Sequence, residues 1–165
     1  IRAVIMNKLE MDVRDTVLLA NAESIAVEAS MVAYEGVVIA AERDAGSLRT
    51  MEENASKFGT HNIEIIPEIT VEALEKLPTP RLAFIVAQKS TIENDIVTLL
   101  KVNPKIKFII YTLELDILAD IKYLMKKHGV DVTEVMQIAV SKVDKNGVFV
   151  AQPAPWMITC EVKEK

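Results

Sequence analysis

Short apolar runs alternate with longer segments of helical period along most of this chain. Runs of four or five residues dominated by Val, Ile, Leu and Ala are typical of strands that are buried on both faces of a parallel sheet. The segments between them repeat apolar residues every three or four positions, which predicts amphipathic helices. The predicted strands are residues 17–20, 37–41, 62–66, 82–86 and 107–111.

The ends of the helical segments carry capping residues and glycines. Ser24, Asp44 and Ser90 stand where a side chain can cap the first turn of a helix, and Ser90 with Glu93 has the spacing of a capping box. Glycines close several of the segments, as expected where the backbone turns left-handed. The predicted helices are residues 1–9, 25–34, 45–58, 70–76, about 90–100 and 113–128.

The pattern changes after the last predicted helix. Val135–Val143 and Val148–Val162 lack helical period, and Asn146-Gly147 between them is a strong hairpin signal. Pro153 and Pro155 place part of the last segment at an edge or a bulge. Five βα units followed by a hairpin predict an α/β fold: a Rossmann-like sandwich with a mostly parallel, seven-stranded sheet and a C-terminal antiparallel hairpin.

Length and composition add limits to this picture. The 165 residues suit one domain, 1–165, and half of them are hydrophobic. A net charge of −5 argues against nucleic acid as the main partner. We expect no membrane segment, because no apolar run approaches the roughly 18–20 residues that span a bilayer.

Cysteine and histidine contribute little candidate chemistry. Cys160 is the one cysteine, so no intrachain disulfide can form, and its apolar surroundings predict a buried strand residue. This usage fits a reducing compartment, and we expect a cytoplasmic protein. No group of Cys, His and acidic residues has zinc-like spacing, so we expect no metal site.

The stretch Thr16–Glu42 is the strongest candidate for a functional site. It predicts a strand, a tight connection, a helix and a second strand that ends in an acid, which is the layout of a nucleotide-type cofactor site. Glu42 could accept hydrogen bonds from ribose hydroxyls, although an ordinary solvated acid at a strand end explains it equally well. The connection contains no glycine, and Asn21 is the residue there that best tolerates a left-handed turn.

Several segments together resemble one enzyme family. They are IRAVIMNKL, SIAVEAS, IAAERD, MEENASKFG, the TLE of IIYTLELDIL, and the late IAVSK with its proline-containing final strand. The chain resembles, over nearly its whole length, the decarboxylating precorrin-6Y methyltransferases of cobalamin synthesis, small-subunit type. The resemblance implies the class I methyltransferase fold, S-adenosylmethionine as cofactor, a tetrapyrrole substrate, and a homo-oligomer, often a tetramer.

The resemblance also implies where ligands would bind. The cofactor positions it assigns are Ala20, Asn21, Glu23, Glu42 and Ile69. Ala87 and Gln88 would border the substrate, and no catalytic base is implied.

This chain departs from the family at most of these positions. Where the family has a motif like DIGAGSG, this chain has Val17–Glu23. The three glycines of the motif are thus replaced by Leu19, Asn21 and Glu23. The resemblance implies that an acid in the family's third-strand loop contacts the adenine of the cofactor, and in this chain Ile69 stands at that adenine position. The glycines after the fourth strand are absent. Glu23 would repel a ligand carboxylate and attract a ligand ammonium. Larger side chains thus stand where the family leaves space for its cofactor.

Two hypotheses follow. In the first, the chain is a divergent precorrin-6Y methyltransferase that transfers a methyl group from S-adenosylmethionine to a tetrapyrrole. In the second, it is a non-catalytic relative that keeps the fold as a binding or assembly subunit. Binding of another nucleotide or metabolite in the same cleft is a third possibility. A cofactor titration separates the first two.

Overall fold

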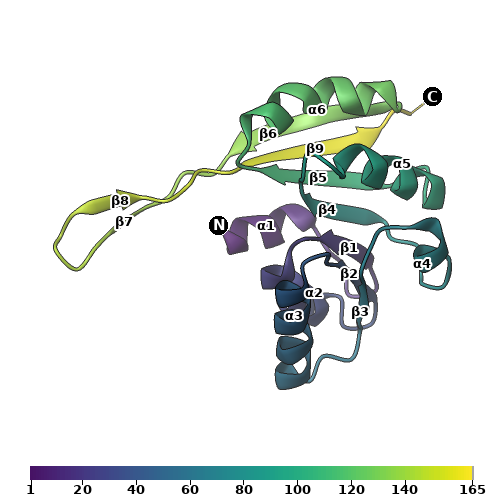
Figure 1. The fold of residues 1–165 in the computed structure, drawn as a ribbon, viewed down its shortest axis with the longest axis horizontal. Coiled ribbons are helices and arrows are strands. Elements are labelled where there is room, and N and C mark those ends of the chain that lie inside the picture. Colours follow the sequence, from purple (N-terminus) through teal and green to yellow (C-terminus); the bar gives the residue numbers. More distant parts are fainter. Residues whose placement is uncertain (165) are drawn as a thin grey trace.

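The computed structural model describes residues 1–164 and contains one large sheet with helices on both faces (Figure 1). The helices are α1 (Arg2–Leu9), α2 (Glu23–Val32), α3 (Ala45–Phe58), α4 (Val71–Glu75), α5 (Ile92–Val102) and α6 (Leu115–Lys127). The strands of the large sheet are β1 (Thr16–Ala20), β2 (Val37–Ala41), β3 (Ile63–Ile66), β4 (Leu82–Val86), β5 (Lys107–Thr112), β6 (Val130–Gln137) and β9 (Trp156–Val162). A separate two-stranded ribbon is formed by β7 (Ser141–Val143) and β8 (Phe149–Ala151).

The order of the seven strands is β3-β2-β1-β4-β5-β9-β6. Neighbouring strands from β3 to β5 pair in parallel, and β9 pairs antiparallel with both β5 and β6. This confirms the predicted fold class, the class I methyltransferase-like Rossmann sandwich. The chain order reverses between β1 and β4, which is where open α/β sheets form their ligand crevice.

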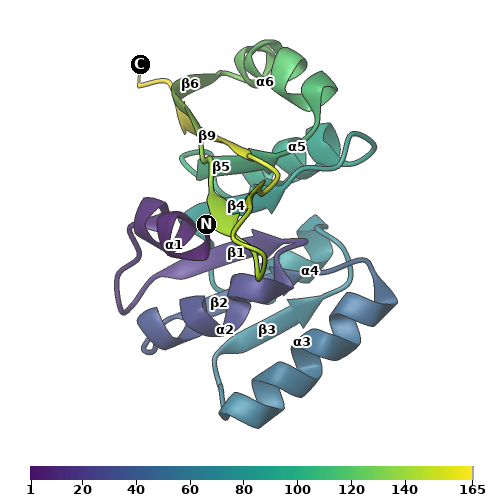
Figure 2. The ribbon, with the colours of Figure 1, turned by 90° about the vertical axis from the view of Figure 1, so that its left-hand side faces the viewer.

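Alternate residues of each strand face opposite helical layers, because strand side chains alternate with a period of two. Leu18 and Ala20 of β1 belong to the core that α4, α5 and α6 cover, whereas Val17 and Leu19 belong to the core under α1, α2 and α3. Figure 2 shows α1 on one side of the central strands and α5 and α6 on the other. Burial of β1 on both faces explains its unbroken apolar sequence.

Most predicted boundaries agree with the structure, and the end of the chain shows the largest correction. A strand was predicted from Val135, but β6 begins at Val130, directly after the left-handed Gly129 that ends α6. The predicted long strand 148–162 is instead two strands, β8 and β9, separated by Pro153 and Pro155. The predicted turn at Asn146-Gly147 is confirmed, and it joins β7 to β8.

Two predicted helix caps are wrong. Helix α2 begins one residue before Ser24, and α5 begins after Thr91 with no side-chain cap, so Ser90 lies outside the helix. Asp44 does cap α3, since its Oδ2 accepts a hydrogen bond from the Ser47 amide at 2.8 Å. Burial of Cys160 in β9 is also confirmed, and this burial raises the pKa of its thiol to about 12.

The β7–β8 ribbon, with its turn, forms an arm that projects away from the sheet (Figure 1). We define the arm as residues 141–151. Four apolar side chains along it are exposed: Val143, Val148, Phe149 and Val150. Within the described residues, no helix combines the length and the apolar character needed to cross a membrane.

Candidate functional site

The carboxyl ends of β1, β2, β3, β4 and β5 meet at one edge of the sheet, because these five strands are parallel. One buried side-chain oxygen, Oδ1 of Asn21, has no hydrogen-bond partner among the described residues. Asn21 directly follows β1, so it belongs to this edge. Unpaired buried polar atoms are rare in proteins and concentrate at functional sites. This edge is therefore the candidate site.

Asn21 spans the point where the strand order reverses. Its backbone is left-handed, with φ of 57°, as predicted for a turn that has lost its glycine. Its amide Nδ2 donates to the carbonyl oxygen of Val86 at 3.2 Å, and its backbone N–H donates to the carbonyl of Ala41 at 2.9 Å. The turn survives, but the asparagine side chain now joins the ends of β1 and β4 across the crevice.

A cleft of about 660 Å³ opens beside Asn21, on the side of the sheet that α1 and α2 cover. We call this part of the edge the cleft half. Its polar and charged lining residues are Arg2, Asn21, Glu23, Ser24, Asn54 and Tyr111. Its apolar lining includes Ile5, Ile25, Phe84 and Val86. Burial raises the pKa of the Tyr111 phenol, so this group stays protonated and can donate a hydrogen bond at neutral pH.

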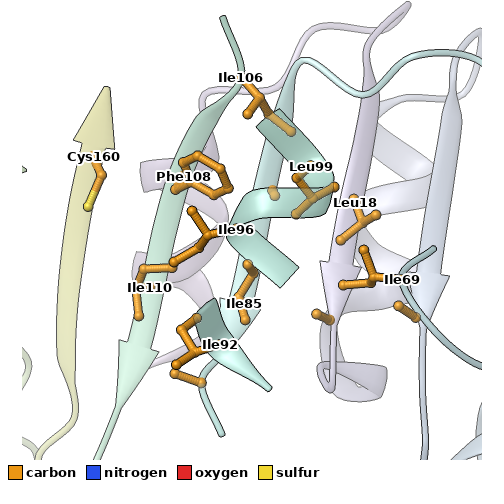
Figure 3. Close-up of a cluster of buried hydrophobic side chains, with 14 of the residues drawn as sticks. Leu18, Ile69, Ile85, Ile92, Ile96, Leu99, Ile106, Phe108, Ile110 and Cys160 are labelled. Atoms are coloured by element: carbon orange, nitrogen blue, oxygen red, sulfur yellow. The ribbon is translucent and has the colours of Figure 1, made fainter. Parts of the chain in front are cut away.

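Two positions expected to hold the nucleoside of the cofactor, Glu42 and Ile69, lie outside that cleft. Ala87, expected to border the substrate, lies with them, and we call the edge around these three residues the nucleoside half. The exposed fractions of these three residues are 4%, 2% and 6%. Ile69 and Ala87 belong to the same apolar core as Ile92 and Ile96 of α5, and Figure 3 shows Ile69 directed toward Leu18 of β1.

The Glu42 carboxylate already has a partner inside the chain. Its Oε1 accepts a hydrogen bond from the backbone N–H of Asp44 at 3.0 Å. Burial raises the pKa of this carboxyl above its ordinary value, and the negative charge of Glu23 raises it further, while the Asp44 hydrogen bond lowers it. An acid that must accept from two ribose hydroxyls needs accessible oxygens, whereas Glu42 is 4% exposed and one of its oxygens is already engaged.

The remaining predicted residues are divided between the two halves. Asn21 and Glu23 line the cleft, whereas Ala20 is fully buried at the end of β1. Gln88 is exposed, and its backbone carbonyl accepts from the amides of Thr91 and Ile92 at the start of α5. Leu19, which replaces a family glycine, lies in β1 and packs beneath α2 instead of filling the loop.

These residues do not fit S-adenosylmethionine. The acid for the ribose is buried and accepts from the Asp44 amide, and an isoleucine of the core stands at the adenine position. The negative charge of Glu23 also raises the pKa of Glu42, so the expected ribose acid has a like charge close to it. The predicted cofactor residues are thus brought to one edge, but not into one open pocket.

Sequence reasoning missed an ion pair at this edge, between Arg43 and Asp95. A signal for it existed. Asp95 falls on the apolar stripe of α5 beside Ile92, Ile96 and Leu99, where a charged residue requires a partner. Arg43 directly follows Glu42, but its partner lies 52 residues along the chain, so the pairing itself could not be predicted.

Comparison with known proteins identifies the family. A model of the precorrin methyltransferase domain matches residues 1–162. No curated protein sequence matches the chain.

Solved structures of the same kind resemble this chain in fold. A precorrin-6Y C5,15-methyltransferase from Geobacter metallireducens is 25% identical, with a TM-score of 0.87 over 98% of this chain and 87% of that one. A precorrin 8W decarboxylase from Methanobacterium thermoautotrophicum is 19% identical, with a TM-score of 0.80 over 98% of this chain and 89% of that one.

A third structure extends the comparison to a multidomain enzyme. The C-terminal domain of precorrin-6Y C5,15-methyltransferase from Rhodobacter capsulatus is 16% identical, with a TM-score of 0.77 over 97% of this chain and 87% of that one. The family match covers nearly the whole chain, and the sheet order with its single reversed strand β9 agrees with it across the described residues. This chain belongs to the precorrin methyltransferase domain family.

Proposed function

We propose that this chain is a non-catalytic member of its family, a binding and assembly subunit of the cobalamin pathway. The observation that carries the proposal is the state of Glu42, which is 4% exposed and bonded to the Asp44 amide. A carboxylate that is nearly closed to solvent and already accepts from the backbone is a poor partner for a cofactor ribose. Burial of Ile69 at the adenine position supports the same conclusion.

The methyltransferase hypothesis remains the second candidate, and the family match over residues 1–162 favours it. The two functions differ in one measurable property. A methyltransferase binds S-adenosylmethionine and its demethylated product, S-adenosylhomocysteine. The non-catalytic subunit binds neither.

The test is calorimetric titration of the chain with S-adenosylhomocysteine, together with thermal unfolding in the same ligand. We expect no binding heat and no shift of Tm at ligand concentrations of about 1 mM, which corresponds to less than roughly 4 kcal/mol of binding free energy. Saturable binding tighter than this limit contradicts the proposal and favours the methyltransferase.

The ligand of the binding role is a tetrapyrrole, as the family implies, and the cleft half is its site. The cleft is open, it combines Arg2 with apolar and aromatic side chains, and it adjoins the unpaired Oδ1 of Asn21. An arginine suits the carboxylates of a precorrin, and apolar walls suit its ring. Glu23 in the same lining would repel a carboxylate placed beside it, so we assign the carboxylates to the Arg2 side of the cleft.

A fluorescent porphyrin that carries carboxylates, uroporphyrin, is a practical probe of this site. Trp156 is the only tryptophan, and it pairs across the sheet with Thr112, the residue after Tyr111 of the cleft. We expect uroporphyrin to quench Trp156 emission saturably and Arg2→Ala to weaken the quenching. Quenching that is linear in porphyrin and equal in both proteins contradicts binding at the cleft.

The assembly role rests on the arm. Phe149 is 77% exposed and lies beside three further exposed valines on a ribbon of only two strands. Such a ribbon is marginally stable by itself, and clustered exposed apolar side chains mark interaction surfaces. We propose that arms of identical subunits pack together in a homo-oligomer, with the tetramer of the family as the expected size.

Sedimentation of a Phe149→Ser variant tests the assembly. We expect the wild-type chain to sediment as an oligomer and the variant to shift toward the monomer. Tyr123→Ser is the matched control, because Tyr123 on α6 is 76% exposed but lies outside the arm. A monomeric wild-type chain, or an equal shift in both variants, contradicts assembly through the arm.

A further inference from the structure

A two-point ion pair crosses the nucleoside half of the edge. Nη2 of Arg43 lies 2.8 Å from Oδ1 of Asp95, and Nη1 lies 3.4 Å from Oδ2. The side chain of Asp95 is 1% exposed and that of Arg43 is 23% exposed. Paired contacts between guanidinium and carboxylate fix the relative orientation of both groups.

The pair joins two elements of the nucleoside half. Arg43 is the residue after Glu42 at the end of β2, and Asp95 lies in the first turn of α5, which follows β4. Ile92 and Ile96, on either side of Asp95 along the helix, share one core with Ile69. The pair therefore connects the loop after β2 to the helix after β4, above the apolar core that contains the adenine position.

The charges around the pair favour this connection. Burial raises the pKa of Asp95, whereas the hydrogen bonds and the positive charge of Arg43 lower it. Glu68, in the loop after β3, adds a negative charge that raises the pKa of Asp95 further. Arg43 is thus the cation that compensates a buried carboxylate, and it cannot leave without stranding that charge.

We propose that Arg43 and Asp95, which we call the closing pair, hold the nucleoside half shut and exclude nucleoside ligands from this chain. This inference rests on the proposed non-catalytic function and gives it a cause. Admission of a nucleoside requires α5 and the loop after β2 to move apart, and movement breaks a buried ion pair. The closing pair therefore excludes the family cofactor in two ways. Its side chains occupy space, and opening the site would separate a buried ion pair.

The direct test removes both charges at once. Arg43→Ala with Asp95→Ala leaves no stranded ion and opens space at the edge. We expect this double variant to bind adenosine and S-adenosylhomocysteine with a Kd below about 1 mM in calorimetric titrations, under conditions in which the wild-type chain gives no binding heat.

Two control variants test whether the gain in binding depends on the position of the removed ion pair and on the space that its removal opens. Lys89→Ala with Asp116→Ala removes a neighbouring ion pair of similar length, 3.0 Å, whose side chains are 70% and 66% exposed, and it should leave binding unchanged. Arg43→Met with Asp95→Leu removes the charges but keeps most of the volume, so it should bind the nucleoside more tightly than the wild-type chain and less tightly than the double alanine variant. Equal gains in the Lys89–Asp116 control contradict the role of the closing pair.

A second measurement covers the case in which the double alanine variant does not fold. Asp95→Asn keeps the size of the side chain and weakens the ion pair. We expect the backbone amides of Arg43 and Asp44 to exchange with deuterium at least about tenfold faster than in the wild-type chain, since local opening frees them. Unchanged exchange contradicts closure by this pair.

The outcomes distinguish this inference from the proposed function. Binding of S-adenosylhomocysteine by the wild-type chain contradicts the non-catalytic function, whatever the variants do. No binding by the wild-type chain and none by a folded double alanine variant leaves the non-catalytic function standing and contradicts the closing pair.

Discussion

The two halves of the candidate site lie at the same edge of one sheet and differ in what fills them. The cleft half is open, and its lining mixes arginine, asparagine, a glutamate and a tyrosine with apolar walls. In the nucleoside half, Glu42, Ile69 and Ala87 are buried, and an ion pair runs across the edge. The family skeleton is intact beneath both. A fold can therefore keep the position of a site while side chains alone decide whether it accepts a ligand.

The largest expected contrast lies within the closing pair itself. Arg43→Ala leaves the 1% exposed Asp95 carboxylate without its partner and is expected to lower the free energy of unfolding by about 3–5 kcal/mol. Asp95→Ala should cost less, because the guanidinium of Arg43 is partly exposed and can turn toward water. Urea denaturation of both variants measures the asymmetry, and equal costs would contradict the burial argument.

The second-largest expected contrast is in how much core packing in each half contributes to the free energy of unfolding. Ile69→Ala removes buried methyl groups and is expected to cost about 2–5 kcal/mol of unfolding free energy. Arg2→Ala in the cleft half should change it by no more than about 0.5 kcal/mol, since the Arg2 side chain is 62% exposed. If Ile69→Ala proves as mild as Arg2→Ala in urea denaturation, Ile69 is not part of a packed core.

Glu42→Gln is expected to change the free energy of unfolding by a smaller amount, and the change should depend on pH. Burial raises the pKa of Glu42 in the folded chain above the ordinary value of 4.5, so ionisation above that range weakens the fold. Below pH 4.5 the carboxyl is protonated in both folded and unfolded chains and resembles the amide.

The stability advantage of Glu42→Gln should therefore be absent at low pH, grow as the pH rises through the folded-state pKa, and stay constant above it. Unfolding measured by urea from pH 4 to pH 8 follows this difference. A gain that is largest at low pH would reverse the assigned direction of the pKa shift and mean that Glu42 is stabilised as an anion.

The smallest expected effect concerns the turn that both halves share. Asn21 has φ of 57°, where glycine is free of strain and alanine is not. We expect Asn21→Ala to be less stable than Asn21→Gly by about 1 kcal/mol, although both lose the hydrogen bond to Val86. Thermal unfolding of the two variants makes the comparison, and equal Tm values would argue against the left-handed turn.

Local signals in the sequence predicted local structure well. Asp44 was predicted to cap α3, and it does, because the cap needs only residues within one turn. Gly59 ends the same helix in the left-handed conformation for an equally local reason. Ser24 and Ser90 failed as caps because a capping residue type is not sufficient when packing shifts the start of a helix.

The candidate site was predicted only in part. Asn21 and Glu23 were expected at the edge and line the cleft there, whereas the cleft residues Arg2 and Tyr111 were not foreseen. They come from α1 and β5, which are far apart in the sequence and meet only when the sheet is assembled. The pairing of Arg43 with Asp95 was missed for the same reason.

The sequence by itself determined the alternation of strands and helices, the left-handed turn at Asn21 and the hairpin at Asn146-Gly147, because each depends on neighbouring residues. Tertiary structure alone decided that Glu42 is buried and bonded, that Arg43 meets Asp95, and that the cleft lies beside Asn21. Burial and ion pairing depend on which distant segments come together, and a pattern of nearby residues does not contain that information.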